Sequence, residues 1–182
     1  MLYKFNINLN DKDYYNFNKF YNFKTHYGRK LLLFYRIFVV VIFIPFILLT
    51  LSDCGYNAEG LVMTILYFIL MGAMELLLKP MLCLGVKMNM KLKKKSGKAP
   101  YTPTAEMVFY DDYFIEQTPQ SKSEILYSII DSLYIDGKGN VYIFVNNIAG
   151  FILLKSCFDS EDQYNSFLTF ISTKTDIIYN TK

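Results

Sequence analysis

The chain has 182 residues, of which 53% are hydrophobic, with a mean hydropathy of +0.20 and a formal net charge of +3. This apolar fraction exceeds the roughly 45–50% of a soluble domain and favours a membrane protein. The charge is unevenly distributed: residues 1–30 carry +4, residues 31–78 carry −2, residues 79–98 carry +7 and residues 99–182 carry −6. Because the acidic C-terminal part would repel a phosphate backbone, we expect no nucleic-acid partner.

A strand and a short helix are predicted within residues 1–30. Residues 2–9 alternate between apolar and polar side chains, which is the pattern of a half-buried strand. Asn10 is a suitable N-cap for the helix that follows. Rings recur in this helix at spacings of three and four, at Tyr14, Phe17 and Tyr21. They either anchor the helix at a membrane interface or pack against the protein's own domain.

Two apolar segments are each long enough to cross a membrane. Residues 31–51 contain a single charge, Arg36, and a helix of this length reaches about 31 Å at about 1.5 Å per residue. Residues 61–78 contain a single charge, Glu75. Because only nine residues connect the segments, the sequence predicts a transmembrane hairpin over residues 31–86.

A basic segment follows the hairpin. Six of the twelve residues from position 87 to 98 are lysines: Lys87, Lys91, Lys93, Lys94, Lys95 and Lys98. We expect residues 87–104 to form a juxtamembrane linker whose lysines contact the anionic membrane surface. Cations also precede the first span, whereas the connecting loop contains Asp53 and Glu59 and no cation. The positive-inside rule therefore places both termini in the cytoplasm.

The two charges within the spans lie at nearly equal depth in an antiparallel hairpin. Arg36 lies 15 residues before Leu51, and Glu75 lies 14 residues after Leu61. Either they form an ion pair that fixes the register of the helices, or Arg36 reaches the headgroups while Glu75 is protonated or faces a partner. Both interpretations are compatible with the spacing.

Residues 105–182 predict a small α+β domain of antiparallel strands closed by one amphipathic helix. Residues 129–135 fit a strand and a helical turn equally well, and Asn146 with Asn147 suits a turn. Ser160 and Gln163 match a capping box before an apolar stripe. The isolated N-terminal strand needs a pairing partner, so we expect it to join the C-terminal sheet, which makes the hairpin an insertion into one domain.

The order of these features resembles the YcxB-like family of bacterial membrane proteins. The resemblance rests on the hairpin and on the segments "LNDKDYYNF", "MVFYDDYFIEQT", "ILYSIIDSLYIDGKGNVYIFV" and "GFILLKSCFDSEDQYNSFLTFI". It implies a cytoplasmic domain similar to a pleckstrin-homology roll, in a multi-pass protein of the bacterial cell membrane. Members often have a tryptophan in the third strand and a proline before the last lysine. This chain has no tryptophan and has Leu154 before Lys155.

No catalytic, metal or cofactor site is predicted. His26, the sole histidine, has no nucleophile arranged beside it, and the three cysteines are far apart. "DGKGN" lacks the strand-to-helix context of a phosphate loop and is typical of a hairpin turn. We therefore expect the protein not to be an enzyme and to need no cofactor or metal.

The sequence favours a membrane-anchored binding, adaptor or sensor module at the inner face of the bacterial membrane, with an unknown protein or peptide partner. One alternative is an immunity or tolerance factor against a membrane-active peptide. Another alternative is an accessory subunit of a transport complex. The sequence makes no prediction of the oligomeric state.

Overall fold

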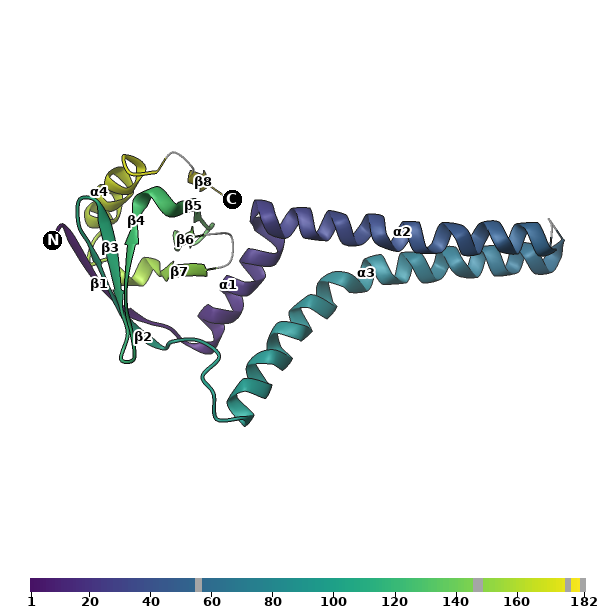
Figure 1. Ribbon diagram of the computed structural model, residues 1–182, viewed down its shortest axis with the longest axis horizontal. Coiled ribbons are helices and arrows are strands. Elements are labelled where there is room, and N and C mark those ends of the chain that lie inside the picture. The colour runs from purple at the N-terminus through teal and green to yellow at the C-terminus, as the bar shows by residue number, and fades with distance from the viewer. Residues whose placement is uncertain (55–56, 146–148, 176–177, 181–182) are drawn as a thin grey trace. The chain divides into compact units, whose positions relative to one another are not determined.

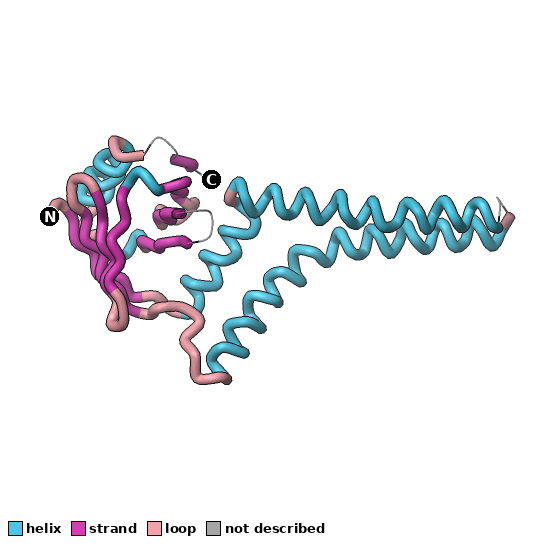
Figure 2. Tube along the Cα trace, viewed as in Figure 1, coloured by secondary structure: helices cyan, strands magenta, loops and turns pink. Residues whose placement is uncertain are grey.

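The structure is a computed structural model that describes residues 1–54, 57–145, 149–175 and 178–180. It divides into two compact units. We call Met1–Phe20 with Gly97–Lys182 the split domain, and Tyr21–Ser96 the helical unit. The fold is α+β, with two long apolar helices and a β-rich domain, which confirms the predicted class (Figures 1 and 2).

The helical unit is built on two long helices, α2 (His26–Cys54) and α3 (Ala58–Lys95). They lie side by side and antiparallel over much of their length (Figure 1). Asn57 caps α3, because its side-chain oxygen accepts a hydrogen bond from the backbone N–H of Gly60 at 2.9 Å. In Figure 1 the C-terminal half of α3 turns away from α2, and the helix contains Pro80, a residue that kinks helices by removing a backbone donor.

Both helices extend beyond the predicted spans, and α3 includes most of the basic segment predicted as a juxtamembrane linker over residues 87–104. The basic segment is helical up to Lys95, Ser96 is the C-cap, and the next strand begins at Thr104. Lysine, methionine and leucine are good helix formers, and lysines in a last turn interact favourably with the helix dipole. The non-helical connection is therefore residues 96–103.

Two four-stranded sheets form most of the split domain (Figure 2). The first has the order β1 (Tyr3–Asn8), β2 (Thr104–Phe109), β3 (Tyr113–Gln117), β4 (Lys122–Leu126). The second has the order β7 (Ala149–Leu153), β6 (Val141–Val145), β5 (Ile130–Ile135), β8 (Ile178–Asn180). Neighbouring strands are antiparallel except β5 and β8, which are parallel.

Three local features differ from the expectations or extend them. The segment 129–135, which fits a strand and a helical turn equally well, is strand β5 from Ile130 onwards, and only Ile129 belongs to the preceding 3₁₀ turn, η1 (Tyr127–Ile129). A second 3₁₀ turn, η2 (Lys155–Cys157), follows β7, and β8 follows the last helix. The turn predicted at Asn146 and Asn147 lies outside the described residues.

The N-terminal strand, which precedes the hairpin in the sequence, pairs with the first strand that follows it. The antiparallel register of β1 and β2 runs from Tyr3 opposite Phe109 to Asn8 opposite Thr104. The side chain of Phe5 is 1% exposed and belongs to the same core as residues of both sheets. This pairing confirms the prediction that the helices are inserted into one domain.

Helix α4 (Glu161–Ser172) packs its apolar stripe into this core. The ring of Phe167 lies 5.2 Å from that of Phe5 and 4.9 Å from that of Phe109, measured between centroids. The backbone N–H of Gln163 donates to Ser160 Oγ at 3.1 Å, and Gln163 Oε1 accepts from the backbone N–H of Asp159 at 2.7 Å. The predicted Ser160 cap is therefore present, whereas the return bond of Gln163 goes to the residue before the cap.

Helix α1 (Asp11–Lys24) crosses the boundary between the units. Within the split domain, the ring centroid of Phe17 lies 5.6 Å from that of Phe144, and that of Phe20 lies 4.7 Å from that of Tyr142. Of the two interpretations of the ring-rich face, packing against the protein's own domain is the one observed for Phe17 and for Tyr14, whose ring centroid lies 4.9 Å from that of Tyr101. The third predicted ring, Tyr21, lies 6.0 Å from the ring of Tyr27 in the helical unit.

Candidate functional site: an apolar groove and an ion pair in the helical unit

The structure brings together the two charges of the apolar spans. Arg36 Nε on α2 lies 3.1 Å from Glu75 Oε2 on α3. Their side chains are 51% and 31% exposed, so both lie on the surface of the helix pair. In a membrane this surface faces lipid, where an unpaired charge is costly. The spacing in the sequence had made this pair one of two possible arrangements.

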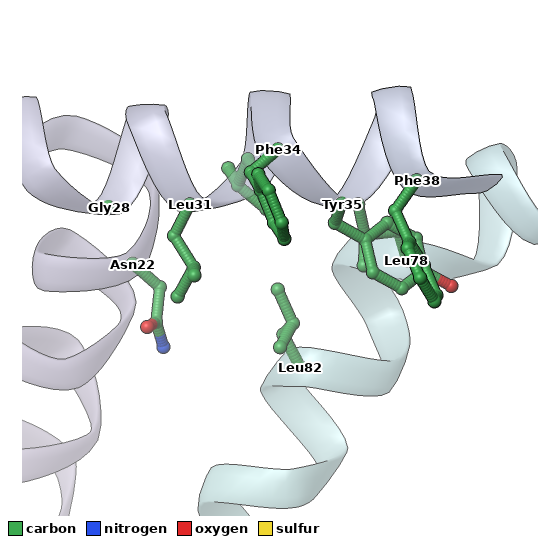
Figure 3. Close-up of a pocket in the computed structure, with 9 residues that line it drawn as sticks. Asn22, Gly28, Leu31, Phe34, Tyr35, Phe38, Leu78 and Leu82 are labelled. Carbon is green, nitrogen blue, oxygen red and sulfur yellow. The ribbon is translucent and has the colours of Figure 1, made fainter. Parts of the chain in front are cut away.

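An apolar groove of about 340 Å³ lies in the helical unit (Figure 3). Its lining residues come from the end of α1, the first half of α2 and the middle of α3: Asn22, Gly28, Leu31, Leu32, Phe34, Tyr35, Phe38, Leu78 and Leu82. In Figure 3 the side chains of Leu31 and Phe34 extend from α2 towards the space, and Leu82 approaches from α3. Asn22 supplies the sole side-chain amide of this lining.

A tight corner between α1 and α2 holds Asn22 next to the groove. The hydroxyl of Thr25, a residue that is 3% exposed, donates to the carbonyl oxygen of Tyr21 at 2.6 Å. The same oxygen of Thr25 accepts from the backbone N–H of Gly28 at 3.0 Å. A Cβ atom on Gly28 would lie 2.1 Å from the carbonyl oxygen of Tyr21, so only glycine permits this close approach.

The close approach at Gly28 leads to a prediction. The Gly28→Ala substitution should destabilise the helical unit by at least about 1–3 kcal/mol, the usual range for overpacking, because the atom it meets belongs to the backbone. The matched variant Gly85→Ala lies in α3, where an added Cβ meets nothing within 4 Å. It should stabilise its helix by about 0.5–1 kcal/mol.

The free energy of unfolding of the two variants, measured in detergent against the wild-type chain, checks this prediction. Equal changes for both alanine variants would show that the corner tolerates a side chain and would contradict it.

The six predicted membrane-contact lysines all have exposed side chains. Five of them lie on α3, and Lys98 follows it. The helical unit contains ten Lys and Arg residues against three Asp and Glu residues, whereas the split domain contains nine against thirteen. The helical unit is therefore basic and the split domain acidic.

Burial in the split domain shifts the pKa values of Tyr142 and Cys157. Burial, followed by the charge of Asp136 and a hydrogen bond to it, raises the pKa of Tyr142 above its ordinary value. Its hydroxyl donates to Asp136 Oδ2 at 2.9 Å. Burial also raises the pKa of the Cys157 thiol, the opposite of the shift that produces a reactive thiolate. Among the described residues, no group of three or more His, Cys, Asp or Glu side chains could hold a metal ion.

Sequence reasoning missed the groove. The Leu, Phe and Tyr residues that line the groove from α2 and α3 have the character of ordinary lipid-facing positions, because apolar side chains predominate in both helices. A groove arises only where the course of α3 leaves space beside α2, and no periodicity in the sequence reports that course. Pro80, between the lining residues Leu78 and Leu82, is the one local signal.

Together these features define an α+β protein with two helices that are long and apolar enough to cross a membrane. Residues 109–171 of the 182-residue chain match the sequence model of the family described as YcxB-like protein, the family that the sequence was predicted to resemble. The matched residues run from the end of β2 through α4. Comparisons with curated proteins and with solved structures gave no match.

Proposed function

We propose that the protein is a membrane-anchored binding module, whose hairpin holds the split domain at the inner face of a bacterial cell membrane. The observation that carries this proposal is the pairing of β1 with β2. These strands precede α2 and follow α3, so they can pair only if both ends of the hairpin emerge on the same side of the membrane. Both termini are then cytoplasmic by the positive-inside rule.

The charges support this orientation. Each lysine near an anionic surface contributes about 1 kcal/mol of attraction, and the basic residues of α3 follow its apolar part. The acidic split domain is repelled by the same surface. This combination fixes the hairpin while leaving the domain open to a cytoplasmic protein or peptide partner. The proposed role needs no catalytic residue, cofactor or metal.

The partner would bind at the edge formed by β4. Among the strands that the structure describes, β4 pairs only with β3, so its outer edge can accept a further strand. Leu126 at the end of β4 and Ile129 in η1 are 49% and 43% exposed. Large apolar side chains beside an open strand edge suit an extended apolar segment of a partner.

Site-specific photo-crosslinking in cells tests this proposal. The full-length chain would carry a photoreactive phenylalanine analogue at Leu126, and a matched chain would carry it at Lys138, an exposed residue in the turn before β6. We expect a discrete adduct from position 126 and none from position 138. No adduct at position 126, or the same adducts at both positions, would contradict the proposed binding face.

A further inference from the structure

We propose that the groove of the helical unit binds one acyl chain of an anionic phospholipid from the cytoplasmic leaflet. This inference rests on the membrane location proposed above. It adds a ligand class to a groove that was not predicted from the sequence.

The size and lining of the groove suit a hydrocarbon chain. Its volume of about 340 Å³ is within the range of ligand pockets, and eight of its nine lining residues are Gly, Leu, Phe or Tyr. An α-helix with its side chains is about 10 Å in diameter, so a single turn of about 5.4 Å already fills roughly 420 Å³, more than the volume of the groove. A single acyl chain is thinner than a helix and is therefore the membrane component that suits this volume.

Selectivity must come from the polar end of the groove. Lipid tails are as apolar as leucine, so the apolar lining alone would bind the tails of different lipids equally well. In Figure 3 the amide of Asn22 lies at the end of the groove formed by α1. Its NH₂ group can donate a hydrogen bond to a phosphate or ester oxygen.

The charge around the groove favours an anionic headgroup. Residues 21–38 and 75–82, which contain all the lining residues, carry five Lys and Arg residues and one carboxylate. That carboxylate, Glu75, already lies against Arg36. Arg29, Lys30 and Lys79 directly follow lining residues or lie one residue beyond them, and their side chains are exposed. Basic pockets between transmembrane helices on the cytoplasmic side bind anionic headgroups.

Because the sequence contains no tryptophan, the fluorescence of one introduced tryptophan reports only on the surroundings of that position. A single reporter would be introduced by Tyr35→Trp, which lines the groove. The control is Ile37→Trp, two residues away and 54% exposed but not in the lining. Each full-length variant would be reconstituted in phosphatidylcholine vesicles that contain a small fraction of brominated phosphatidylglycerol or the same fraction of brominated phosphatidylcholine.

We expect the fluorescence of the Tyr35→Trp variant to be quenched several-fold more by brominated phosphatidylglycerol than by brominated phosphatidylcholine. The Ile37→Trp variant should be quenched equally by both lipids. If Tyr35→Trp does not fold, Phe38→Trp provides a second reporter in the lining. Adding Arg29→Gln, Lys30→Gln and Lys79→Gln to the lining reporter should remove its preference.

The outcomes separate this inference from the proposed function. Equal quenching of both reporters by both lipids would overturn the lipid site while leaving the membrane location intact. No quenching of Ile37→Trp by either lipid would overturn the membrane location and the lipid site with it. A preference that persists after the three glutamine substitutions would overturn the assignment of the headgroup to these cations.

Discussion

Replacing Phe5 with alanine should destabilise the split domain by about 3–5 kcal/mol, the usual cost of removing a buried phenylalanine ring. The side chain is 1% exposed, and its ring centroid lies 4.7 Å from that of Phe158 and 5.2 Å from that of Phe167. The variant would therefore leave a cavity where β1, α4 and the segment before α4 meet. Urea unfolding of the full-length chain in detergent, followed by the near-ultraviolet circular dichroism of its tyrosines, measures the change.

The control for this prediction is Leu2→Ala at the start of the same segment. Leu2 is 53% exposed, and substitutions of exposed residues usually change the free energy of unfolding by less than about 0.5 kcal/mol. If Phe5→Ala proved as mild as Leu2→Ala, β1 would not be part of the folded domain, and the hairpin would not be an insertion.

Reversing one charge of the Arg36–Glu75 pair should impair membrane insertion, and reversing both should restore it. The Nε–Oε2 distance of 3.1 Å is that of a direct ion pair. A single reversal leaves two like charges within the apolar spans, and each costs about 2.5–3.5 kcal/mol at a helix centre on insertion scales. The fraction of full-length protein recovered in carbonate-washed membranes measures the effect for Arg36→Glu, Glu75→Arg and the double variant.

A geometric control separates pairing from net charge. It combines Arg36→Glu with Glu75→Leu and Leu76→Arg, so the cation moves by one residue, about 100° around α3. Leu76 is 81% exposed, and its side chain leaves α3 on a different side of the helix from that of Glu75. We expect this variant to insert as poorly as the single reversals. Equal recovery of the control and the double reversal, or no recovery in either, would contradict the ion pair.

The elements of the split domain were predictable because their patterns are local. Alternation in residues 2–9 predicts β1, and the capping box at Ser160 predicts α4; both are present. The pairing of β1 with the C-terminal sheet followed from the cost of an unpaired strand. By contrast β8 contains only three residues, too few for a periodic signal.

The helical unit shows what hydropathy does not report. Hydropathy shows which residues can cross a membrane, but it does not show where the helix ends. Helix α3 continues beyond its apolar part to Lys95, because lysines are themselves good helix formers. Arg36 and Glu75 lie at nearly equal depth in their spans, so an ion pair was one of two arrangements that the sequence allowed. The structure contains this pair. The groove depends on the course of α3 and on the corner at Gly28, which are set by contacts between helices.

We propose that the hairpin crosses the membrane and that the split domain closes on its cytoplasmic side, and cysteine labelling tests this topology directly. Single cysteines at Lys12, Glu59 and Lys98, all exposed positions, would be introduced into a variant without the three native cysteines. They would then be treated with a membrane-impermeant maleimide. In intact cells only Glu59→Cys should react, and Lys12→Cys and Lys98→Cys should react only after permeabilisation. Labelling of Lys12→Cys and Lys98→Cys from opposite sides of the membrane would contradict the claim, because β1 and β2 could then not pair.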